Sequence, residues 1–556
     1  MKKILIFLSL IVVMGLVGCS LTTETQTQTT ETSQTSQSNQ TTETSLTTES
    51  STNSTGVSST LTTEITTEIS TDNTVETTEE YDRYQDIYLY STNDFHGGAY
   101  IDYNQFSLIS GKIQEMRSSY DHVIALSNGD MLQGTAFSNY YYGKPFIEAM
   151  NIGEFDGFVI GNHEFDWGIE KIAEYNDGLF ENGEANYPFL AANIVYKDSL
   201  EPLEFTIPYI ISEVNGVKVG VIGLIGDVIN SIAYSRVENI LFLDPLETIE
   251  NYAYELRVNQ EVDVVVVYIH SDSSINMDIA SLSGNYKVDA VFNGHSHWNE
   301  ASYITRTGVD LAYAQSSSKD YSLLAEIKIT FDLEIEEVIE VSPRTYAESE
   351  LTSYDQGVID IFNDYSTDQV YLDFINQILS FSEGSFDRSD LAPWGASVIR
   401  DYLGIDFGAV NTGGFRVNME YGDITMGEMI TIYPFDNVIK TTEMTGQQIT
   451  DFLSEINYYN NDVVFDDSLT FDGTTAYVNN IPIVLNQLYT VGAVDYIFDK
   501  TDYDFIEGIN ISYTGIYLRD LLVEDLLNTE SFSPYDGSNY VEPMSYFYNE
   551  IYNEIR

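Results

Sequence analysis

Gly157-Phe158-Val159-Ile160-Gly161-Asn162-His163-Glu164-Phe165-Asp166 is a short apolar run followed at once by polar side chains. An uncharged run of this length is typical of a strand that is buried on both faces of a parallel sheet. In open α/β sheets, functional sites form from the loops beyond the carboxyl ends of such strands. The stretch therefore predicts a strand that ends at a polar site.

The same pattern recurs in the first half of the folded chain. Apolar runs rich in β-branched residues occur at 87–90, 123–126, 217–224, 262–269 and 290–292. Between the first two runs, residues 106–117 are expected to form a helix. The alternation of short buried strands with helices predicts an α/β domain.

Histidine is scarce in this chain, and it is concentrated where the apolar runs end. The polar motifs are Asn-Asp-Phe-His at 93–96, Asn-Gly-Asp at 128–130, Gly-Asn-His-Glu at 161–164 and Gly-His-Ser-His at 294–297. These motifs hold four of the six histidines, and a fifth, His270, ends a run of valines. The sixth, His122, has no such motif, and we expect it to be structural or solvent-facing.

This set of side chains indicates a metal centre. Carboxylate, amide and imidazole groups are the ligands that Zn, Mn, Fe and similar divalent ions take. Two ions ~3.5–4 Å apart need one bridging carboxylate and a few terminal ligands each, and the motifs supply that number. A single histidine at a strand end is more often structural, so the prediction depends on the ordered set.

The rest of the chain predicts a second domain. Residues 354–364 are expected to form a helical connector, after which strands and helices mix again. This part contains Asn-Thr-Gly-Gly-Phe-Arg at 411–416 and Tyr-Pro-Phe-Asp-Asn at 433–437. Glycines let a backbone approach a ligand closely, and an arginine fork can grip a phosphate or a carboxylate. Alone, the first motif is weak evidence, and Phe435 taken alone is better interpreted as a core residue after a turn.

The ordered histidine motifs resemble the calcineurin-like metallophosphoesterases. The motifs of the second domain resemble the 5′-nucleotidase family, which includes bacterial UDP-sugar hydrolases and 2′,3′-cyclic nucleotide phosphodiesterases. The resemblance implies an α/β fold: an N-terminal α/β/β/α sandwich at 81–345, a connector at 346–372 and a second α/β nucleotide-binding domain at 373–556. It also implies two divalent metal ions, such as Zn or Mn.

The same resemblance assigns roles to the residues of the first domain. The first metal would be held by Asp94, His96, Asp130 and His297, with Asp130 bridging, and the second by Asn162, His270 and His295. His163 would face the substrate as a catalytic residue, with Asp166 orienting its ring and raising its pKa. The loop after His270 departs from the family pattern, since Ser271 and Asp272 follow it.

In the second domain, the resemblance implies a nucleotide-binding surface. The residues implied are Asn411, Gly413, Gly414, Arg416, Phe435, Tyr496, Asp502 and Arg388. Phe435 and Tyr496 would stack on the base, although Phe498 fits the second position as well. Asp502 would contact the ribose, and Arg388 would be a further phosphate-gripping arginine. The Gly-Gly-Asp-Gly turn of the family is replaced here by Lys-Thr-Asp-Tyr at 500–503.

The N-terminus predicts export and lipid attachment. Two lysines precede an apolar run at 4–18, and the residues before Cys19 resemble a bacterial lipobox. We expect a signal peptide at 1–18 and lipid on Cys19, the only cysteine, for which a free-thiol catalyst is the alternative. Residues 19–80, rich in Thr, Ser and Glu, are expected to be a disordered tether with a reach of at least ~40 Å. The predicted location is the extracellular face of the cell membrane.

The net charge of −64 limits the partners. It argues against binding a nucleic-acid polymer through a basic groove. It also repels anionic substrates at long range, so a metal centre would have to supply the local positive charge. No obligate protein partner is evident.

The predicted function is hydrolysis of phosphate from nucleoside 5′-phosphates, or from 2′,3′-cyclic nucleotides or UDP-sugars, by hydroxide attack at two metals. Two alternatives stay open. One is a diesterase or pyrophosphatase specialist. The other is an inactive surface-binding lipoprotein of the same fold, which would be free to lose a ligand, whereas the ligand set here is complete.

Overall fold

The computed structural model describes residues 83–178, 183–459, 463–501 and 503–539. The predicted signal peptide, Cys19, the tether and Asp502 lie outside these residues. The described chain forms one compact unit.

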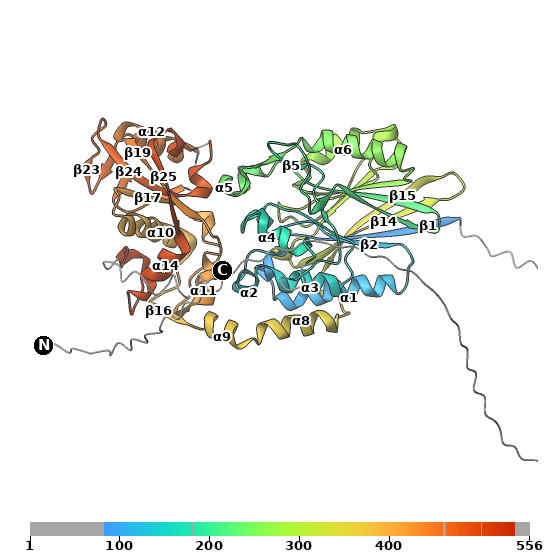
Figure 1. Ribbon diagram of the computed structural model, residues 1–556, viewed down its shortest axis with the longest axis horizontal. Helices are drawn as coiled ribbons and strands as arrows, with labels where there is room; N and C mark the ends of the chain where they lie inside the picture. Colours follow the sequence, from blue (N-terminus) through green and yellow to red (C-terminus); the bar gives the residue numbers. More distant parts are fainter. Residues whose placement is uncertain (1–82, 179–182, 460–462, 502, 540–556) are drawn as a thin grey trace, which may run out of the picture. The chain divides into compact units, whose positions relative to one another are not determined.

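The first half of the described chain contains two sheets (Figure 1). One sheet has the order β15-β14-β1-β2-β3-β4-β6. Its strands are β1 (Tyr84–Thr92), β2 (Val123–Ser127), β3 (Gly157–Val159), β4 (Phe189–Leu190), β6 (Thr206–Ile207), β14 (Ser322–Asp332) and β15 (Glu337–Ala347). The strands from β1 to β6 run parallel, so their carboxyl ends share one edge.

The other sheet has the order β12-β13-β11-β10-β8-β7. Its strands are β7 (Tyr209–Val214), β8 (Val217–Ile225), β10 (Val264–His270), β11 (Ala290–Phe292), β12 (Glu300–Ile304) and β13 (Leu311–Gln315). Strands β8, β10, β11 and β13 are parallel. A separate pair of short strands is β5 (Ile194–Tyr196) with β9 (Ile240–Phe242).

The two sheets pack face to face, and helices cover their outer faces. In β10, Val264 and Val266 face a core shared with the first sheet, whereas Val265 and Val267 pack in a separate core with helices. Because both faces of the strand are buried, β10 is apolar up to its last residue, His270. The first sheet is covered by α1 (Phe106–Arg117), α3 (Lys144–Ile152) and α8 (Gln356–Ser366), and the second by α6 (Pro245–Tyr254) and α7 (Asn276–Ser281). The predicted α/β/β/α sandwich is confirmed.

Local predictions agree closely with these elements. The helix expected at 106–117 is α1, and the strand expected at 290–292 is β11. The connector expected at 354–364 is two helices, α8 and α9 (Gln369–Ile375). The remaining short helices of this half are α2 (Ala136–Tyr140), α4 (Ile169–Ala173) and α5 (Tyr234–Val237).

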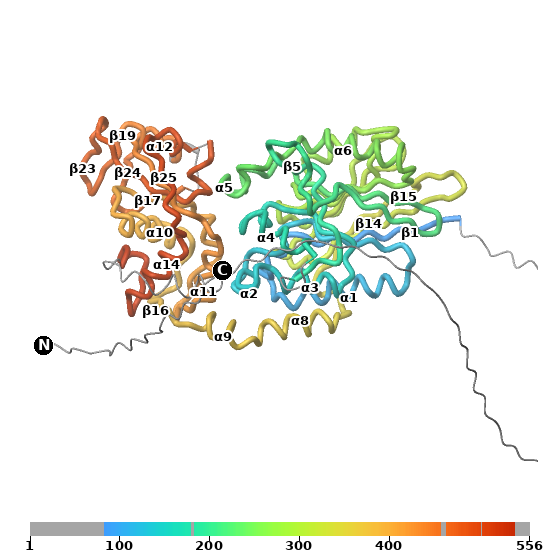
Figure 2. Tube along the Cα trace, viewed as in Figure 1, coloured from blue at the N-terminus to red at the C-terminus, as the bar shows by residue number. Residues whose placement is uncertain are grey.

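The second half is built on a mixed sheet of order β20-β17-β24-β19-β25, traced in orange and red in Figure 2. Its strands are β17 (Phe407–Asn411), β19 (Val438–Thr445), β20 (Val463–Phe465), β24 (Leu488–Val494) and β25 (Ile509–Tyr517). Smaller sheets pair β16 (Ile378–Ser382) with β18 (Gly422–Thr425), and β21 (Leu469–Phe471), β22 (Ala476–Val478) and β23 (Ile481–Pro482). The helices are α10 (Arg388–Leu403), α11 (Met426–Ile432), α12 (Gly446–Tyr459), α13 (Asp495–Phe498) and α14 (Leu518–Leu527).

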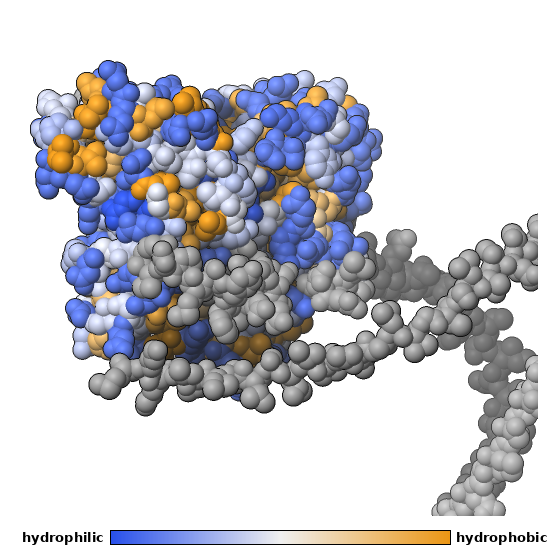
Figure 3. Space-filling model, turned by 60° about the vertical axis from the view of Figure 1, so that its left-hand side comes forward, coloured by the Kyte–Doolittle hydropathy of each residue, from blue (hydrophilic) through white to orange (hydrophobic). Residues whose placement is uncertain are grey.

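The surface is mixed in polarity. On the face in Figure 3, hydrophobic side chains lie in separate groups among hydrophilic ones. Within the described ranges, none of the helices combines the length and hydropathy needed to cross a bilayer.

Candidate metal centre and substrate cavity

The seven predicted metal ligands all lie at the carboxyl ends of parallel strands. Asp94 and His96 follow β1, Asp130 follows β2, Asn162 follows β3, His270 ends β10, and His295 and His297 follow β11. Strands β1, β2 and β3 are neighbours in one sheet, and β10 and β11 are neighbours in the other. The fold therefore brings ligands from both sheets to one place.

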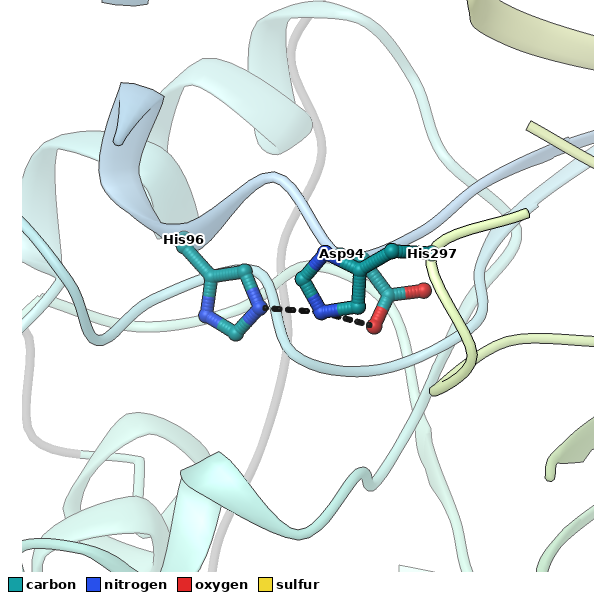
Figure 4. Close-up of side chains that lie close together, drawn as sticks. All are labelled: Asp94, His96 and His297. Atoms are coloured by element: carbon teal, nitrogen blue, oxygen red, sulfur yellow. Dashed lines mark hydrogen bonds and ion pairs between the residues drawn. The ribbon is translucent and has the colours of Figure 1, made fainter. Parts of the chain in front are cut away.

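One group of side chains consists of Asp94, His96 and His297, which point toward one another in Figure 4. The Nε2 atoms of His96 and His297 are 3.3 Å apart, and His297 Nε2 lies 3.5 Å from Asp94 Oδ1. Potential ligand atoms of the group lie within 4.8 Å of one another.

A second group surrounds Asp130. Its Oδ2 lies 3.2 Å from His270 Nε2. The Oδ1 atom of Asn162 lies 3.1 Å from His270 Nε2 and 2.8 Å from His295 Nδ1. Asp130 also clusters with His96 of the first group, so it lies between the two groups, as a bridging carboxylate must.

Backbone carbonyls orient two of the imidazole rings. The Nδ1 atom of His96 lies 3.1 Å from the carbonyl oxygen of Gln133, and that of His270 lies 2.7 Å from the carbonyl oxygen of Asn128. A ring whose Nδ1–H donates to a carbonyl presents the Nε2 lone pair to the centre, which is the form that binds a metal.

Five of the seven ligands have a left-handed backbone. Their φ angles are 51° for Asp94, 51° for His96, 55° for Asp130, 70° for His295 and 55° for His297. Residues other than glycine rarely adopt this backbone conformation, which costs ~1–3 kcal/mol per residue. Residues that do adopt it tend to cluster at functional sites.

Burial keeps three of the ligand imidazole rings in the neutral form, in which one ring nitrogen has a free lone pair. It lowers the pKa of His295 and of His297 to about 4, and that of His96 well below its ordinary value. Neutral imidazole is the form that ligates metals. His270 differs because, against burial, the neighbouring Asp130 carboxylate raises its pKa to about 10.

The motif residue Glu164, which the sequence did not single out, ties two ligand loops together. Its buried carboxylate accepts hydrogen bonds from the backbone N–H groups of Asp130 (2.8 Å), Met131 (3.0 Å) and Gly161 (2.8 Å). Burial, together with the charge of Asp130, raises the pKa of Glu164 to about 7. Its only sequence signal is its place in Gly-Asn-His-Glu, which does not reveal these amide partners.

His163 and Asp166 form a pair beside the metal ligands. The Nδ1 atom of His163 lies 2.7 Å from Asp166 Oδ2, and its backbone N–H donates to Asp130 Oδ1 over 2.8 Å. Burial alone would lower the pKa of His163, but the carboxylates of Asp166 and Asp130 raise it above its ordinary value. The ring is therefore biased toward the charged imidazolium.

A cavity of about 220 Å³ adjoins these groups. It is lined by Asp130, Asn162, His163, Asp166, Ser231, Ala233, His295, His297, Asn411, Gly413, Gly414, Arg416, Phe435, Asn437 and Tyr496. The Phe435 ring stacks near His163, with centroids 5.9 Å apart and planes at 26°. The guanidinium carbon of Arg416 lies 5.7 Å from the Phe435 ring centroid. Metal-ligand side chains and the second-half motifs thus share one cavity.

Some of the residues predicted to bind substrate line the cavity, and others do not. Tyr496 lines the cavity, whereas Phe498 is buried in the core and stacks on Phe505. Arg388 is exposed at the start of α10 and does not line the cavity, so the structure does not bring it to the other predicted residues. The reason is local, because Asp387 and Asp390 cap that helix start and place Arg388 in its first turn.

The sequence missed three cavity residues, and it predicted His122 to be structural or solvent-facing. Ser231, Ala233 and Asn437 line the cavity without belonging to any predicted site. Asn437 did lie in a quoted motif, but Ser231 and Ala233 had no signal. His122 is buried away from the centre, 3.4 Å from the Ser212 hydroxyl, which is a structural position.

Comparison with known proteins agrees with this geometry. Residues 89–299 match the calcineurin-like phosphoesterase family, and residues 371–506 match the 5′-nucleotidase C-terminal domain. The chain is 25% identical over 66% of its length to the trifunctional nucleotide phosphoesterase protein YfkN of Bacillus subtilis, covering 27% of that protein. It is 25% identical over 61% of its length to an apyrase of Tabanus yao, covering 65% of it. The match thus spans less than two thirds of either relative.

A solved structure, that of a 5′-nucleotidase precursor from Thermus thermophilus, shares the fold. The TM-score is 0.63 at 19% identity, over 81% of this chain and 97% of that one. A cluster of carboxylate and imidazole side chains at the strand ends of such a fold is what the class of calcineurin-like phosphoesterases is expected to contain. The chain belongs to the family in which a calcineurin-like phosphoesterase domain is joined to a 5′-nucleotidase C-terminal domain.

Proposed function

We propose that this protein is a nucleotidase that removes phosphate from nucleoside 5′-phosphates at the outer face of the cell membrane. The observation that carries the proposal is the shared cavity. His163 and Asp130 line it from one domain, and Arg416, Phe435 and Tyr496 line it from the other. A nucleotide with its phosphate at the metal ligands could thus have its sugar and base bound by the second domain in the same cavity.

The donor groups fit two divalent ions. Asp94, His96, Asp130 and His297 would hold the first ion, and Asn162, His270 and His295 the second. In the first group, two ring nitrogens face each other at 3.3 Å, where a cation between them would satisfy both lone pairs. The nitrogen and oxygen donors suit Zn, Mn or a similar ion. When bound, such ions polarise phosphate oxygens and make water a nucleophile near neutral pH.

His163 is the proposed catalytic residue of the chain itself. Asp166 holds its Nδ1, so Nε2 is the atom that can face a substrate. A charged imidazolium there would stabilise negative charge on the phosphate and give a proton to the departing 5′ oxygen.

The second domain would bind the rest of the nucleotide. Arg416 is the only arginine or lysine among the described residues that line the cavity, and its fork can grip phosphate oxygens. The backbone of Gly413 and Gly414 permits close approach. Phe435 and Tyr496 would stack on the base, which in other proteins contributes ~1–3 kcal/mol per base.

The location rests on the sequence of the N-terminus. Lipid on Cys19 would hold the enzyme at the membrane, and the tether of residues 19–80 would let the folded part reach substrate in the medium. Radiolabelled palmitate incorporated into the wild-type chain but not into a Cys19→Ala variant would support this, and equal labelling of both would refute it.

The activity is tested by phosphate release. Purified protein is assayed with AMP, 2′,3′-cyclic AMP, ADP and UDP-glucose, before and after EDTA, with Mn or Zn added back. We expect AMP to be the best substrate, with activity lost in EDTA and restored by one of the ions. A preference for the cyclic diester or for UDP-glucose would indicate the diesterase or pyrophosphatase alternative. No turnover of any substrate with metal bound would indicate an inactive binding protein.

A further inference from the structure

The two aromatic walls of the cavity come from separate segments of the second domain. Phe435 lies in the turn that follows α11, and Tyr496 lies in the short helix α13. Attraction between a base and two rings depends on close contact on both faces and falls quickly when a gap opens. Some structure must therefore fix the separation of these two segments.

Asp495, directly before Tyr496, connects them. The residue is buried, with a relative exposure of 1%. Its Oδ1 accepts from the side-chain amide of Asn437 (3.0 Å) and from the backbone N–H of Tyr496 (2.9 Å). Asn437 belongs to the turn that carries Phe435, so one carboxylate bonds to both aromatic segments.

The Phe435 side of this connection is itself held. The Oδ1 atom of Asn437 accepts a hydrogen bond from the hydroxyl of Tyr433 over 3.1 Å. Tyr433 is fully buried, and its ring meets Phe435 edge to face, with centroids 6.1 Å apart. The turn therefore has little freedom to move except together with Asn437.

The phosphoesterase domain completes the arrangement through α5. The hydroxyl of Ser235 donates to Asp495 Oδ2 over 2.7 Å. The next residue, Arg236, donates from Nη2 to the carbonyl oxygen of Asp436 over 2.8 Å. One short helix thus contacts the supports of both aromatic walls.

We propose that Asp495 is a positioning residue that sets the separation of Phe435 and Tyr496, and that Ser235 holds Asp495 in place. This inference rests on the proposed function, because it gives the two rings a base to bind. A buried carboxylate that loses its hydrogen-bond donors raises the free energy of the folded state. The Asp495 carboxylate therefore holds its donors, and the segments that carry them, in place. Asp495 touches neither the phosphate site nor the metal ligands, and its effect is on base recognition.

The test compares a substrate that has a base with one that lacks it. AMP and ribose 5-phosphate carry the same phosphate ester, so the ratio of their kcat/KM values isolates the base. For Asp495→Ala we expect this ratio to fall about tenfold, mostly through the KM for AMP, which is about the effect of losing one stacked ring. Asp495→Asn keeps an oxygen for Asn437 and should recover most of the ratio. Ser235→Ala should lower the ratio about threefold.

Matched variants separate positioning from general damage. Asp525 is an equally buried carboxylate of the same domain that accepts from Trp394 Nε1 (2.9 Å) and does not line the cavity. Asp525→Ala should lower the melting temperature and leave the ratio unchanged. Ser281→Ala removes an exposed hydroxyl that bonds only locally, and it should change neither.

The outcomes are distinguishable. If wild-type protein does not hydrolyse AMP, the proposed function fails. If wild-type protein prefers AMP but folded Asp495→Ala and Ser235→Ala keep the wild-type ratio, the positioning role is overturned and the proposed function stands. A drop in the ratio for Asp525→Ala equal to that for Asp495→Ala also overturns it. Should Asp495→Ala not fold, Ser235→Ala alone decides.

Discussion

The candidate metal centre and the proposed base-binding wall of the cavity are built by different means. Each proposed metal ligand ends a parallel strand or follows it by at most a few residues, and the backbone carbonyls of Gln133 and Asn128 orient two of the rings. The base-binding wall uses a turn and the short helix α13, and side chains such as Asp495 and Asn437 join them. Chemistry is thus fixed by the sheets, whereas recognition depends on a few side-chain hydrogen bonds.

This difference teaches where changes should matter. Substitutions at the strand ends should remove the reaction for every substrate. Substitutions in the wall should change the preference among substrates and leave the reaction itself intact. The following predictions are ordered from the largest expected effect on turnover to the smallest.

Asp130→Ala should abolish activity on all substrates, by at least about a thousandfold, because the carboxylate between the two metal groups is lost. The second domain should stay folded, since Asp130 is not part of its core. Phosphate release and metal content by elemental analysis measure this. An active, metal-loaded Asp130→Ala protein would falsify the site.

His163→Ala should lower kcat by roughly a hundredfold or more, because a charged group next to the phosphate is lost. Metal content should stay close to wild type, since the proposed ligands are other residues. Steady-state kinetics with AMP and with ribose 5-phosphate should show the same loss. A loss confined to AMP would move His163 from chemistry to base recognition.

Phe435→Ala should raise the KM for AMP about tenfold and change turnover of ribose 5-phosphate much less, because one stacking face is removed. The matched control is Phe498→Leu, which alters a buried ring outside the cavity. That control should lower the melting temperature without changing the KM. Equal effects of both variants on the KM would contradict the stacking role.

Added salt should lower the KM for AMP by about twofold between low ionic strength and 0.15 M, because it screens the repulsion between the anionic substrate and a chain of net charge −64. The effect on kcat should be negligible. A KM that rises steeply with salt would show that local cations govern the approach of substrate.

His122→Gln should leave turnover unchanged and alter stability in acid. Burial lowers the pKa of His122 to about 4, whereas in an unfolded chain it is ~6.5. Between these two pKa values the unfolded state binds a proton that the folded state does not. The stability that the folded protein has with neutral His122 is therefore lost as the pH falls from ~6.5 toward 4. Acidification should lower the free energy of unfolding of the wild-type protein by up to roughly 3 kcal/mol more than that of the variant. Denaturant melts at pH 7 and pH 4.5 measure this difference. Identical pH dependence in both proteins would exclude this role.

The sequence predicted the strands of the α/β domain well, because strands buried on both faces are continuous apolar runs, whereas the sandwich was implied by the family resemblance. The run at 264–269 is apolar at every position since both of its faces are covered. The same logic placed the candidate ligands together, because parallel strands end at a common edge. Strand ends could be located without knowing any side-chain contact.

Other parts of the site left no such trace. Glu164 acts through three backbone amides, and no residue pattern shows where amides point. Ser231 and Ala233 reach the cavity only because of how the chain between β8 and β9 folds. Arg388 was chosen by resemblance, and the capping of α10 places it elsewhere. Contacts made between distant segments by single side chains are the part that spacing cannot predict.

The left-handed backbone at five of the ligand positions has a further consequence. Glycine adopts this conformation most easily, so at Asp94, His96, Asp130, His295 and His297 the best residue for the backbone is one that has no ligand to offer. A chain optimised for folding alone would place glycine there. The ligand side chains present instead lower the stability of the folded state in exchange for a metal site. Each bound cation would stabilise the fold at these positions of strained backbone.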